Sequence, residues 1–201
     1  EADMPTMVEG AAHDEKAASL RLGAHIRLLR HARAMTLVQL ADATDLSHPF
    51  LSQLERGLAQ PSLSTLRRVA VALETSPIEL IAAADAAAAD VADVEVHRQG
   101  EGMIDASFAT GSARMLVTGS RPIHPLEVTG DNAEPGEAYV HAEDEFAYVL
   151  EGEIMIELDG TARKLRVGDS AYYAGTTPHR WWSPGGARFR LLVVKQGLRA
   201  R

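Results

Sequence analysis

Residues 36–57 read TLVQLADATDLSHPFLSQLERG, and this stretch decides the fold of the N-terminal part of the chain. It contains two short runs of apolar residues at helical spacing, which predict two helices joined by a tight turn. Thr36 and Ser47 stand directly before the two runs, where a side-chain oxygen can accept a hydrogen bond from a backbone N–H of the first turn. The second helix is expected to open at Ser47 and to close at Gly57.

The polar side of the second predicted helix carries candidate DNA-reading groups. Leu51 and Leu54 fall on one face of this helix and mark its buried side. A helix in the DNA major groove contacts bases through its N-terminal part and its exposed side. The residues that lie off the buried face are His48, Pro49, Phe50, Ser52 and Gln53. This arrangement predicts DNA binding.

The segment around these helices resembles a known family. From Leu22 to Ile81 it is similar to the helix-turn-helix domain of phage repressors and xenobiotic-response-element regulators, on the motifs LSQLERG at 51–57, QPSLSTL at 60–66 and SPIEL at 76–80. The resemblance implies a compact domain of five helices that dimerises on a two-fold symmetric operator in double-stranded DNA. It implies base contacts by His48, Pro49, Phe50 and Gln53, phosphate contacts by Thr36, Ser52, Arg56 and Ser62, and a place for Ser47 at the start of the reading helix.

The distribution of charge agrees with a local DNA-binding segment. The whole chain carries a formal net charge of −8, which argues against a protein that coats nucleic acid along its full surface. Residues 16–73 hold eight Lys and Arg against three Asp and Glu, so this segment has a charge of 8 − 3 = +5. Arg27, Arg30 and Arg33 lie within it. These three arginines can either contact DNA phosphates or simply form the solvated face of a helix, and the sequence leaves both roles open.

Length and composition set the limits of the remaining chain. With 201 residues, of which 46% are hydrophobic, the chain fits two small domains with separate cores. It contains no cysteine, which excludes disulfides, thiolate metal sites and thiol catalysis. No apolar run approaches membrane-spanning length, and the N-terminal residues do not form a signal sequence. We therefore expect a cytoplasmic protein that does not contact membranes.

The predicted fold class is α+β with two domains. We expect a disordered segment at 1–19, an all-α domain of five helices at 20–82, an Ala-rich and semi-rigid linker at 83–94, and an all-β domain at 95–197. Short alternating runs predict the strands 113–118, 145–150, 153–159, 163–167, 170–174 and 187–194. The pair Asp159-Gly160 predicts a hairpin between residues 153–158 and 161–166. Such strands without intervening helices indicate a β-barrel or a jelly roll.

The all-β segment is similar to the cupin family. Residues 136–154, GEAYVHAEDEFAYVLEGEI, resemble its first signature, and residues 168–179, GDSAYYAGTTPH, resemble its second. The resemblance implies a double-stranded β-helix barrel and places His141, Glu145 and His179 at three of its four metal-ligand positions. Tyr139 occupies the fourth position, so the usual set of four ligands is incomplete. A divalent Zn, Fe or Ni ion is the cofactor that this ligand set implies.

Two interpretations of these three residues remain open. Two histidines and one carboxylate on a divalent ion leave positions for substrate and oxygen, as in non-haem iron oxygenases, and a cupin epoxidase acting on hydroxypropylphosphonate has the same two domains and the same ligands. The alternative is a polar cluster without a metal in a sensor domain, beside an effector pocket that includes Tyr139 and Trp181. Arg188 and Arg190 lie on one face of the last strand; if this face is the inner one, it indicates an anionic effector.

The prediction drawn from both domains is a transcriptional regulator. The N-terminal domain binds operator DNA as half of a homodimer, and the cupin domain senses a small molecule and supports dimerisation. The alternative is an iron-dependent cupin oxygenase whose helical domain shapes the active site.

Overall fold

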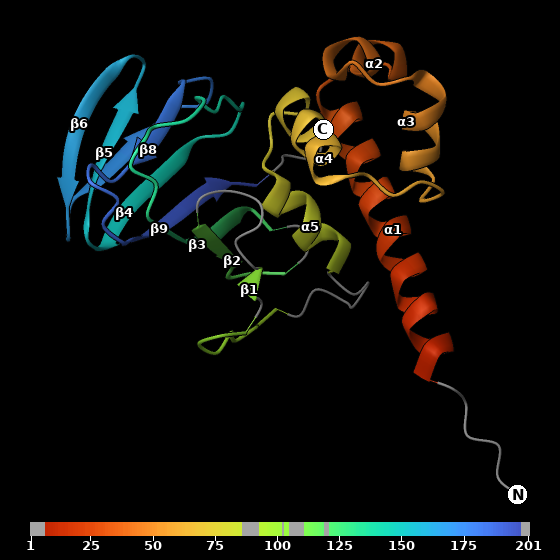
Figure 1. The fold of residues 1–201 in the computed structure, drawn as a ribbon, viewed down its shortest axis with the longest axis horizontal. Coiled ribbons are helices and arrows are strands. Elements are labelled where there is room, and N and C mark those ends of the chain that lie inside the picture. Colours follow the sequence, from red (N-terminus) through yellow and green to blue (C-terminus); the bar gives the residue numbers. More distant parts are fainter. Residues whose placement is uncertain (1–6, 86–92, 102, 105–110, 119–120, 198–201) are drawn as a thin grey trace, which may run out of the picture. The chain divides into compact units, whose positions relative to one another are not determined.

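The computed structural model describes residues 7–85, 93–101, 103–104, 111–118 and 121–197. The chain divides into two compact units, residues 1–88 and 89–201, and the division falls inside the segment predicted as a linker. In the ranges described, no helix combines the length and the apolar character that a membrane crossing requires. The first unit is α-helical and the second is built from antiparallel strands, which confirms the predicted fold class (Figure 1).

In the part of the first unit that the structure describes, five helices follow one another in the order that the sequence predicts. They are α1 (Met7–Ala32), α2 (Leu37–Thr44), α3 (His48–Glu55), α4 (Leu63–Ala72) and α5 (Pro77–Asp85). The side chain of Thr36 accepts from the backbone N–H of Gln39 at the start of α2, and the side chain of Ser47 accepts from Phe50 at the start of α3. Both predicted caps are therefore present, and they fix where the two helices begin.

The N-terminal helix is longer than predicted. Residues 7–19, expected to be disordered, belong to α1, so that prediction is wrong for this range, while residues 1–6 lie outside the described residues. Residues 7–19 hold four Ala and two Glu, which favour helix. Adding residues to an existing helix is also far cheaper than nucleating one. Gln60 also donates from Nε2 to Glu15 Oε1 at 2.9 Å, which ties this part of α1 to the loop before α4. In the predicted linker, residues 83–85 end α5 and residues 86–92 are not described.

Close packing of α1 against α3 positions α3. Gly23 is buried where α1 crosses α3, and a Cβ atom at this position would lie 2.4 Å from the carbonyl oxygen of Leu54. Only glycine permits this approach. The core around the contact consists of fully buried aliphatic side chains, among them Ile26, Leu40, Leu51, Leu54, Val69 and Leu80.

A buried ion pair links the same two helices. Arg30 Nε lies 2.6 Å from Glu55 Oε1, and its Nη2 lies 2.9 Å from Glu55 Oε2, which makes the contact bidentate. The side chains are 8% and 5% exposed. Arg33 donates to the carbonyl oxygens of Leu73 and Glu74. Arg30 is therefore neither a phosphate contact nor a solvated side chain, because its guanidinium is enclosed between α1 and α3.

Removing one partner of this pair is expected to destabilise the helical unit strongly. Arg30→Met leaves the Glu55 carboxylate buried without its cation, which costs on the order of 3–5 kcal/mol. The double variant Arg30→Met/Glu55→Met should cost less than this single change, because no uncompensated charge remains. The free energy of unfolding of both variants is measured by following the helical circular dichroism signal during denaturant unfolding. A single variant as stable as the wild type would contradict the assignment.

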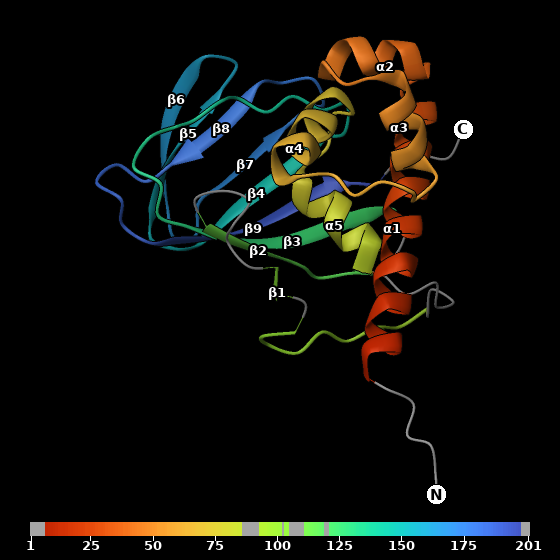
Figure 2. The same ribbon diagram turned by 45° about the vertical axis from the view of Figure 1, so that its right-hand side comes forward.

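The described residues of the second unit form nine strands in two antiparallel sheets. They are β1 (Met103–Ile104), β2 (Gly111–Met115), β3 (Ile123–Gly130), β4 (Glu145–Glu151), β5 (Glu153–Leu158), β6 (Thr161–Arg166), β7 (Ser170–Tyr173), β8 (His179–Trp182) and β9 (Phe189–Gln196). One sheet has the order β1-β2-β3-β9-β4-β7 and the other the order β6-β5-β8 (Figure 2).

The predicted hairpin is confirmed, and one long strand was missed. Asp159 and Gly160 both have positive φ, at 49° and 74°, and Leu158 pairs with Thr161, as a two-residue hairpin requires. Strand β3 escaped prediction because Pro125 interrupts its pattern, and proline normally marks an edge or a non-strand segment. Here β3 lies between β2 and β9, and the Pro125 carbonyl accepts from Leu116 N–H at 2.9 Å.

The last strand turns its apolar residues inward. Phe189, Leu191 and Val193 of β9 are buried, whereas Arg190 is half-buried and pairs with Glu127 and Glu151. Arg188 is exposed just before the strand. The two arginines therefore do not line the interior, and they give no support for an anionic effector.

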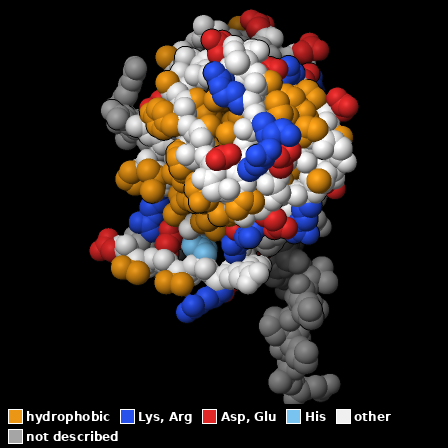
Figure 3. Space-filling model, turned by 90° about the vertical axis from the view of Figure 1, so that its left-hand side faces the viewer, with side chains coloured by type: hydrophobic (Ala, Val, Ile, Leu, Met, Phe, Trp, Pro, Cys, Tyr) orange, Lys and Arg blue, Asp and Glu red, His pale blue; other side chains and the backbone are white. Residues whose placement is uncertain are grey.

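The outer face of the three-stranded sheet mixes apolar and charged side chains. Met155 pairs with Trp182 across β5 and β8, and the ion pairs of Glu153 with Lys164 and of Glu157 with Arg180 flank them. Figure 3, which views the molecule from this side, shows hydrophobic side chains interrupted by basic and acidic ones. Charged side chains thus break up the apolar surface on this face.

Candidate functional site

Strand register assembles a polar row at one end of the inner face of the larger sheet. Glu145, the first residue of β4, pairs with Tyr173 of β7 on one side and with Lys195 of β9 on the other. All three are buried, at 5% exposure each. Two residues further along the strands, Ala147 pairs with Val193, so the next row is apolar. The polar groups are thereby confined to one end of an otherwise hydrophobic interior.

Two histidines complete this row from other elements. His179 begins β8 of the smaller sheet, and His141 lies in the segment that leads into β4. Backbone hydrogen bonds join the two segments. The N–H groups of Tyr139 and His179 each donate to the carbonyl oxygen of the other residue, and Thr176 N–H donates to the backbone carbonyl oxygen of His141. Both imidazoles are buried, at 7% and 3% exposure.

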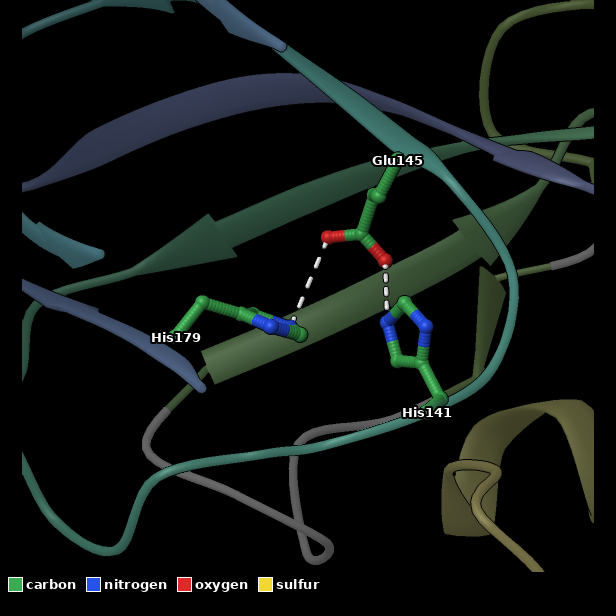
Figure 4. Close-up of side chains that lie close together, drawn as sticks. All are labelled: His141, Glu145 and His179. Atoms are coloured by element: carbon green, nitrogen blue, oxygen red, sulfur yellow. Dashed lines mark hydrogen bonds and ion pairs between the residues drawn. The ribbon is translucent and has the colours of Figure 1, made fainter. Parts of the chain in front are cut away.

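The three predicted ligand residues converge on the Glu145 carboxylate. Oε2 of Glu145 lies 2.9 Å from His141 Nε2, and Oε1 lies 3.7 Å from His179 Nε2 (Figure 4). The Tyr173 hydroxyl donates to Oε1 as well. One candidate donor atom from each of His141, Glu145 and His179 lies within 4.8 Å of the others. The carboxylate thus stands between two imidazoles, with one oxygen directed toward each.

The backbone fixes the orientation of both imidazole rings. His141 Nδ1 lies 2.9 Å from the Glu143 carbonyl oxygen, and His179 Nδ1 lies 3.0 Å from the Thr177 carbonyl oxygen. A carbonyl only accepts, so each Nδ1 carries the proton. In the neutral ring Nε2 then has a lone pair, and this lone pair faces a carboxylate oxygen. Two lone pairs and a carboxylate at this distance require a cation between them, either a proton or a metal ion.

Burial and charge set the ionisation of the cluster. Burial opposes the charged form of Glu145, but its hydrogen bonds with His141 and with the Tyr173 hydroxyl outweigh burial, and the pKa of Glu145 lies below its ordinary value. Burial also opposes the charged form of His179 and so lowers its pKa, although the negative charge of Glu145 acts in the opposite direction. Burial and the adjacent carboxylate raise the pKa of Tyr173, which stays a phenol. The site therefore favours neutral His179 with an ionised Glu145.

The donor set fits a divalent transition metal. Neutral imidazole nitrogen and carboxylate oxygen are ligands of Zn and of non-haem Fe(II), and the carbonyls behind both rings are the outer partners that such ligands require. The separations of 2.9 and 3.7 Å are compatible with ligands about 2.0–2.2 Å from one shared ion.

Tyr139 and Trp181 lie around the cluster without joining it. The Tyr139 side chain is 44% exposed, and its ring centroid lies 6.3 Å from that of His179. Trp181 is half-buried and stacks near His179 with a centroid distance of 6.0 Å. Both residues therefore flank His179. Their assignment to an effector pocket remains a prediction.

Sequence reasoning missed Tyr173 and Lys195. Tyr173 follows Tyr172 in an alternating run, and the sequence alone does not say which tyrosine faces inward. The structure buries Tyr173 and leaves Tyr172 65% exposed. Lys195 shares its parity with Phe189, Leu191 and Val193, but the predicted strand ended at residue 194. Extending the alternation by one residue would have placed Lys195 inside.

The predicted DNA-contacting residues lie together around α2, α3 and the start of α4. Phe50 and Ser52 are half-buried. The exposed members of the set are Thr36, Ser47, His48, Pro49, Gln53, Arg56 and Ser62. The hydroxyls of Thr36, Ser47 and Ser62 each cap a helix by accepting a backbone hydrogen bond. A hydroxyl that accepts can still donate, so the caps themselves do not rule out phosphate contacts.

Comparison with known proteins identifies both units. The cupin domain family matches residues 128–195, and a helix-turn-helix domain family matches residues 21–84. The chain joins a helix-turn-helix domain to a cupin domain. This confirms the resemblances that the motifs indicated.

The helix-turn-helix domain is similar to parts of several curated proteins. It is 43% identical over 54 residues to an uncharacterised HTH-type transcriptional regulator of Mycobacterium tuberculosis, an alignment covering 27% of this chain and 39% of the relative. It is 44% identical over 54 residues to the immunity repressor protein of Bacillus phage phi105, covering 27% and 38%. The chain thus spans about two fifths of the length of the curated relatives it matches.

Solved structures resemble the chain over both domains. A transcriptional regulator of the HTH_3 family from Vibrio cholerae aligns with a TM-score of 0.54 and 19% identity, covering 94% of this chain and 99% of the other. At that identity the likeness shows the fold alone. Hydroxypropylphosphonic acid epoxidase from S. wedmorenis aligns with a TM-score of 0.44 and 24% identity, covering 90% and 99%. So low a TM-score supports no conclusion about function.

The lowered pKa of His179 predicts an acid-sensitive cupin domain. When the folded pKa lies below the unfolded value, the unfolded state binds more protons and stability falls as the pH decreases. For metal-free protein we expect the free energy of unfolding to fall as the pH drops below about 6.5, the ordinary histidine value. Both tryptophans, Trp181 and Trp182, lie in the cupin domain, so their fluorescence during denaturant unfolding reports on this domain. His179→Gln should weaken this pH dependence; an unchanged dependence would contradict the assignment.

Proposed function

We propose that this protein is a ligand-responsive transcriptional regulator. Its helix-turn-helix domain binds operator DNA as half of a homodimer, and its cupin domain binds a small-molecule effector and supports the dimer. The observation that carries the proposal is the exposed side of α3, which is capped by Ser47 and bears His48 and Gln53 within a segment of positive charge. The transcriptional-regulator names of the matched relatives support it.

The expected DNA contacts divide into two classes. His48, Pro49, Phe50 and Gln53 lie at the start and along the outer side of α3, where a major-groove helix reads base edges. The second class lies near phosphates and comprises Thr36, Ser52, Arg56 and Ser62, while Ser47 caps the start of α3. Base contacts select the sequence, and phosphate contacts position the domain and make binding depend on salt. An effector alters DNA binding only through unequal affinity for two arrangements of the dimer.

We further propose that the cupin domain holds one divalent metal ion. His141 Nε2, Glu145 and His179 Nε2 would bind it, and the Glu143 and Thr177 carbonyls would keep both rings in the ligating orientation. The ion would supply a Lewis acid with open positions for oxygen atoms of the effector. Tyr173 holds one Glu145 oxygen by its hydroxyl, and the buried aliphatic rows exclude water from the other side.

Alanine substitutions on α3 should separate base reading from phosphate contact. Gln53→Ala is expected to weaken binding to a duplex selected with the wild-type protein by about 5- to 100-fold and to relax its sequence preference. Arg56→Ala should weaken binding to all duplexes and reduce the salt slope by about 1. Fluorescence anisotropy across a salt series measures both effects.

Arg163→Ala is the matched control for the DNA experiment. Arg163 is an exposed arginine of the cupin domain and hydrogen-bonds to the Thr161 carbonyl. Its loss should leave DNA affinity unchanged. If Gln53→Ala and Arg56→Ala also leave affinity for every duplex unchanged, the proposed DNA interface is wrong.

Metal content tests the cupin site. Protein purified without chelator should contain about one Zn, Fe or Ni ion per chain by elemental analysis, and His141→Ala or Glu145→Gln should abolish it, since a site of three ligands loses most affinity with any one of them. His48→Ala removes an exposed histidine of the other domain and should retain the metal. Full metal content in His141→Ala would rule out this site.

A cupin oxygenase is the second candidate function. The buried cluster of two histidines and one carboxylate favours it, because this ligand set with open positions is the one used by non-haem Fe(II) oxygenases. Oxygen consumption by the Fe(II)-loaded protein, together with no sequence-selective DNA binding, would favour the enzyme over the regulator.

A further inference from the structure

Lys195 places an ammonium group inside the cupin domain, beside the candidate metal ligands. The residue is 5% exposed and stands in register with Glu145 on the neighbouring strand, so both side chains leave the sheet on the same face. Residues paired in this way have Cβ atoms about 4.5–5.5 Å apart. Buried lysines are rare in proteins, because desolvating the ammonium group is costly. The position of Lys195 therefore requires a reason.

The charge of Lys195 reaches the rest of the cluster. Its Nζ lies 3.9 Å from Glu143 Oε2, and the same oxygen lies 4.0 Å from His141 Nδ1. Burial is the main cause of the lowered pKa of His179, and the positive charge of Lys195 acts in the same direction. The ammonium group thus acts on His179 through its charge and is connected to His141 through the Glu143 carboxylate.

The formal charges of this buried group do not cancel once a metal is bound. Glu143 and Glu145 contribute two negative charges, Lys195 contributes one positive charge, and the neutral imidazoles contribute none. The proton that the metal-free site holds between an imidazole and Glu145 brings this sum from −1 to 0, and a divalent ion in its place brings it to +1. An uncompensated charge in a low-dielectric interior is costly, so the metal-loaded site favours one further negative charge beside the ion and Lys195.

We infer that the cupin site takes a small organic acid, whose carboxylate lies between the bound metal and Lys195. This inference rests on the metal site of the proposed function and adds the charge class of the effector. Ala147 and Val193 form the apolar row next to the polar one, and the Trp181 ring lies beside His179. These neighbours suit an acid whose part beyond the carboxylate is short and apolar. Arg188 and Arg190 play no part, because the interior cation is Lys195.

Matched anionic and neutral probes test the inference. The full chain is loaded with Co²⁺, whose visible absorption responds to a change of ligand, and is titrated with L-lactate or with lactamide, in which an amide replaces the carboxylate. Lys195→Met removes the charge and keeps a side chain of similar length. Lys164→Met makes the same change at an exposed lysine that pairs with Glu153, and it serves as the control.

We expect lactate to change the Co²⁺ spectrum at a concentration at least tenfold lower than lactamide does. Lys195→Met should bind Co²⁺ within about threefold of the wild type and lose at least tenfold in lactate affinity, as expected for one charged contact. Lys164→Met should behave as the wild type. Equal binding of lactate and lactamide, no response to either, or unchanged lactate affinity in Lys195→Met overturns the inference.

The outcomes distinguish this inference from the proposed function. If the wild-type chain takes up no Co²⁺, the proposed metal site is wrong. If it binds Co²⁺ without preferring lactate to lactamide, only the inference about the effector is wrong. If Lys195→Met takes up no Co²⁺, its lactate affinity cannot be measured in this way. The preference of the wild-type chain for lactate over lactamide then tests the inference by itself. The affinity of the protein for DNA is measured in a separate experiment, so the test of the DNA interface does not depend on either result.

Discussion

The buried carboxylate of Glu145 is the constraint around which the cupin domain is arranged. Its two oxygens face two imidazole nitrogens, and backbone carbonyls hold the opposite side of each ring. A negative charge in this position requires a positive one, and the surroundings offer places for a proton, for a metal ion and for the Lys195 ammonium group. The ionisation of the cluster and the proposed metal and effector sites therefore all depend on this buried carboxylate.

The helix-turn-helix domain depends on contacts behind the surface that we propose reads DNA. Gly23 allows α1 to touch the backbone of α3, and the Arg30–Glu55 pair fixes the same two helices from the inside. The outer side of α3 is thereby left to polar and exposed residues. A rigid support of this kind matters for DNA reading, because bidentate base contacts require a defined helix position.

A regulator with these two domains needs energetic coupling between them. Effector binding at His141, Glu145 and His179 can change DNA affinity only if the ligand binds one dimer arrangement more tightly than another, and the DNA then changes effector affinity by the same factor. A ligand that completes the charge of a buried metal site can have a large differential affinity, because the cost of an uncompensated charge is high.

The sequence alone predicted the five helices and most of the strands, and the predicted strand bounds lie within three residues of the observed ones. Helix caps such as Thr36 and Ser47 and the Asp159-Gly160 turn are local signals, since each depends on hydrogen bonds or dihedral angles within a few residues. The family motifs supplied His141, Glu145 and His179 as candidate ligands, and the structure brings these three together. Strand β3 was missed because the local effect of Pro125 is overridden by the neighbouring strands.

Only the tertiary structure decided which side chains face one another. Arg30 belongs to a buried pair because Glu55, 25 residues away, approaches it across two helices. Tyr173 and Lys195 enter the site because β7 and β9 both pair with β4 at Glu145, and Arg190 is excluded because its parity on β9 is opposite. Alternation along a strand gives two faces without saying which is inside. That choice is made by the register between strands distant in sequence, which a local pattern does not contain.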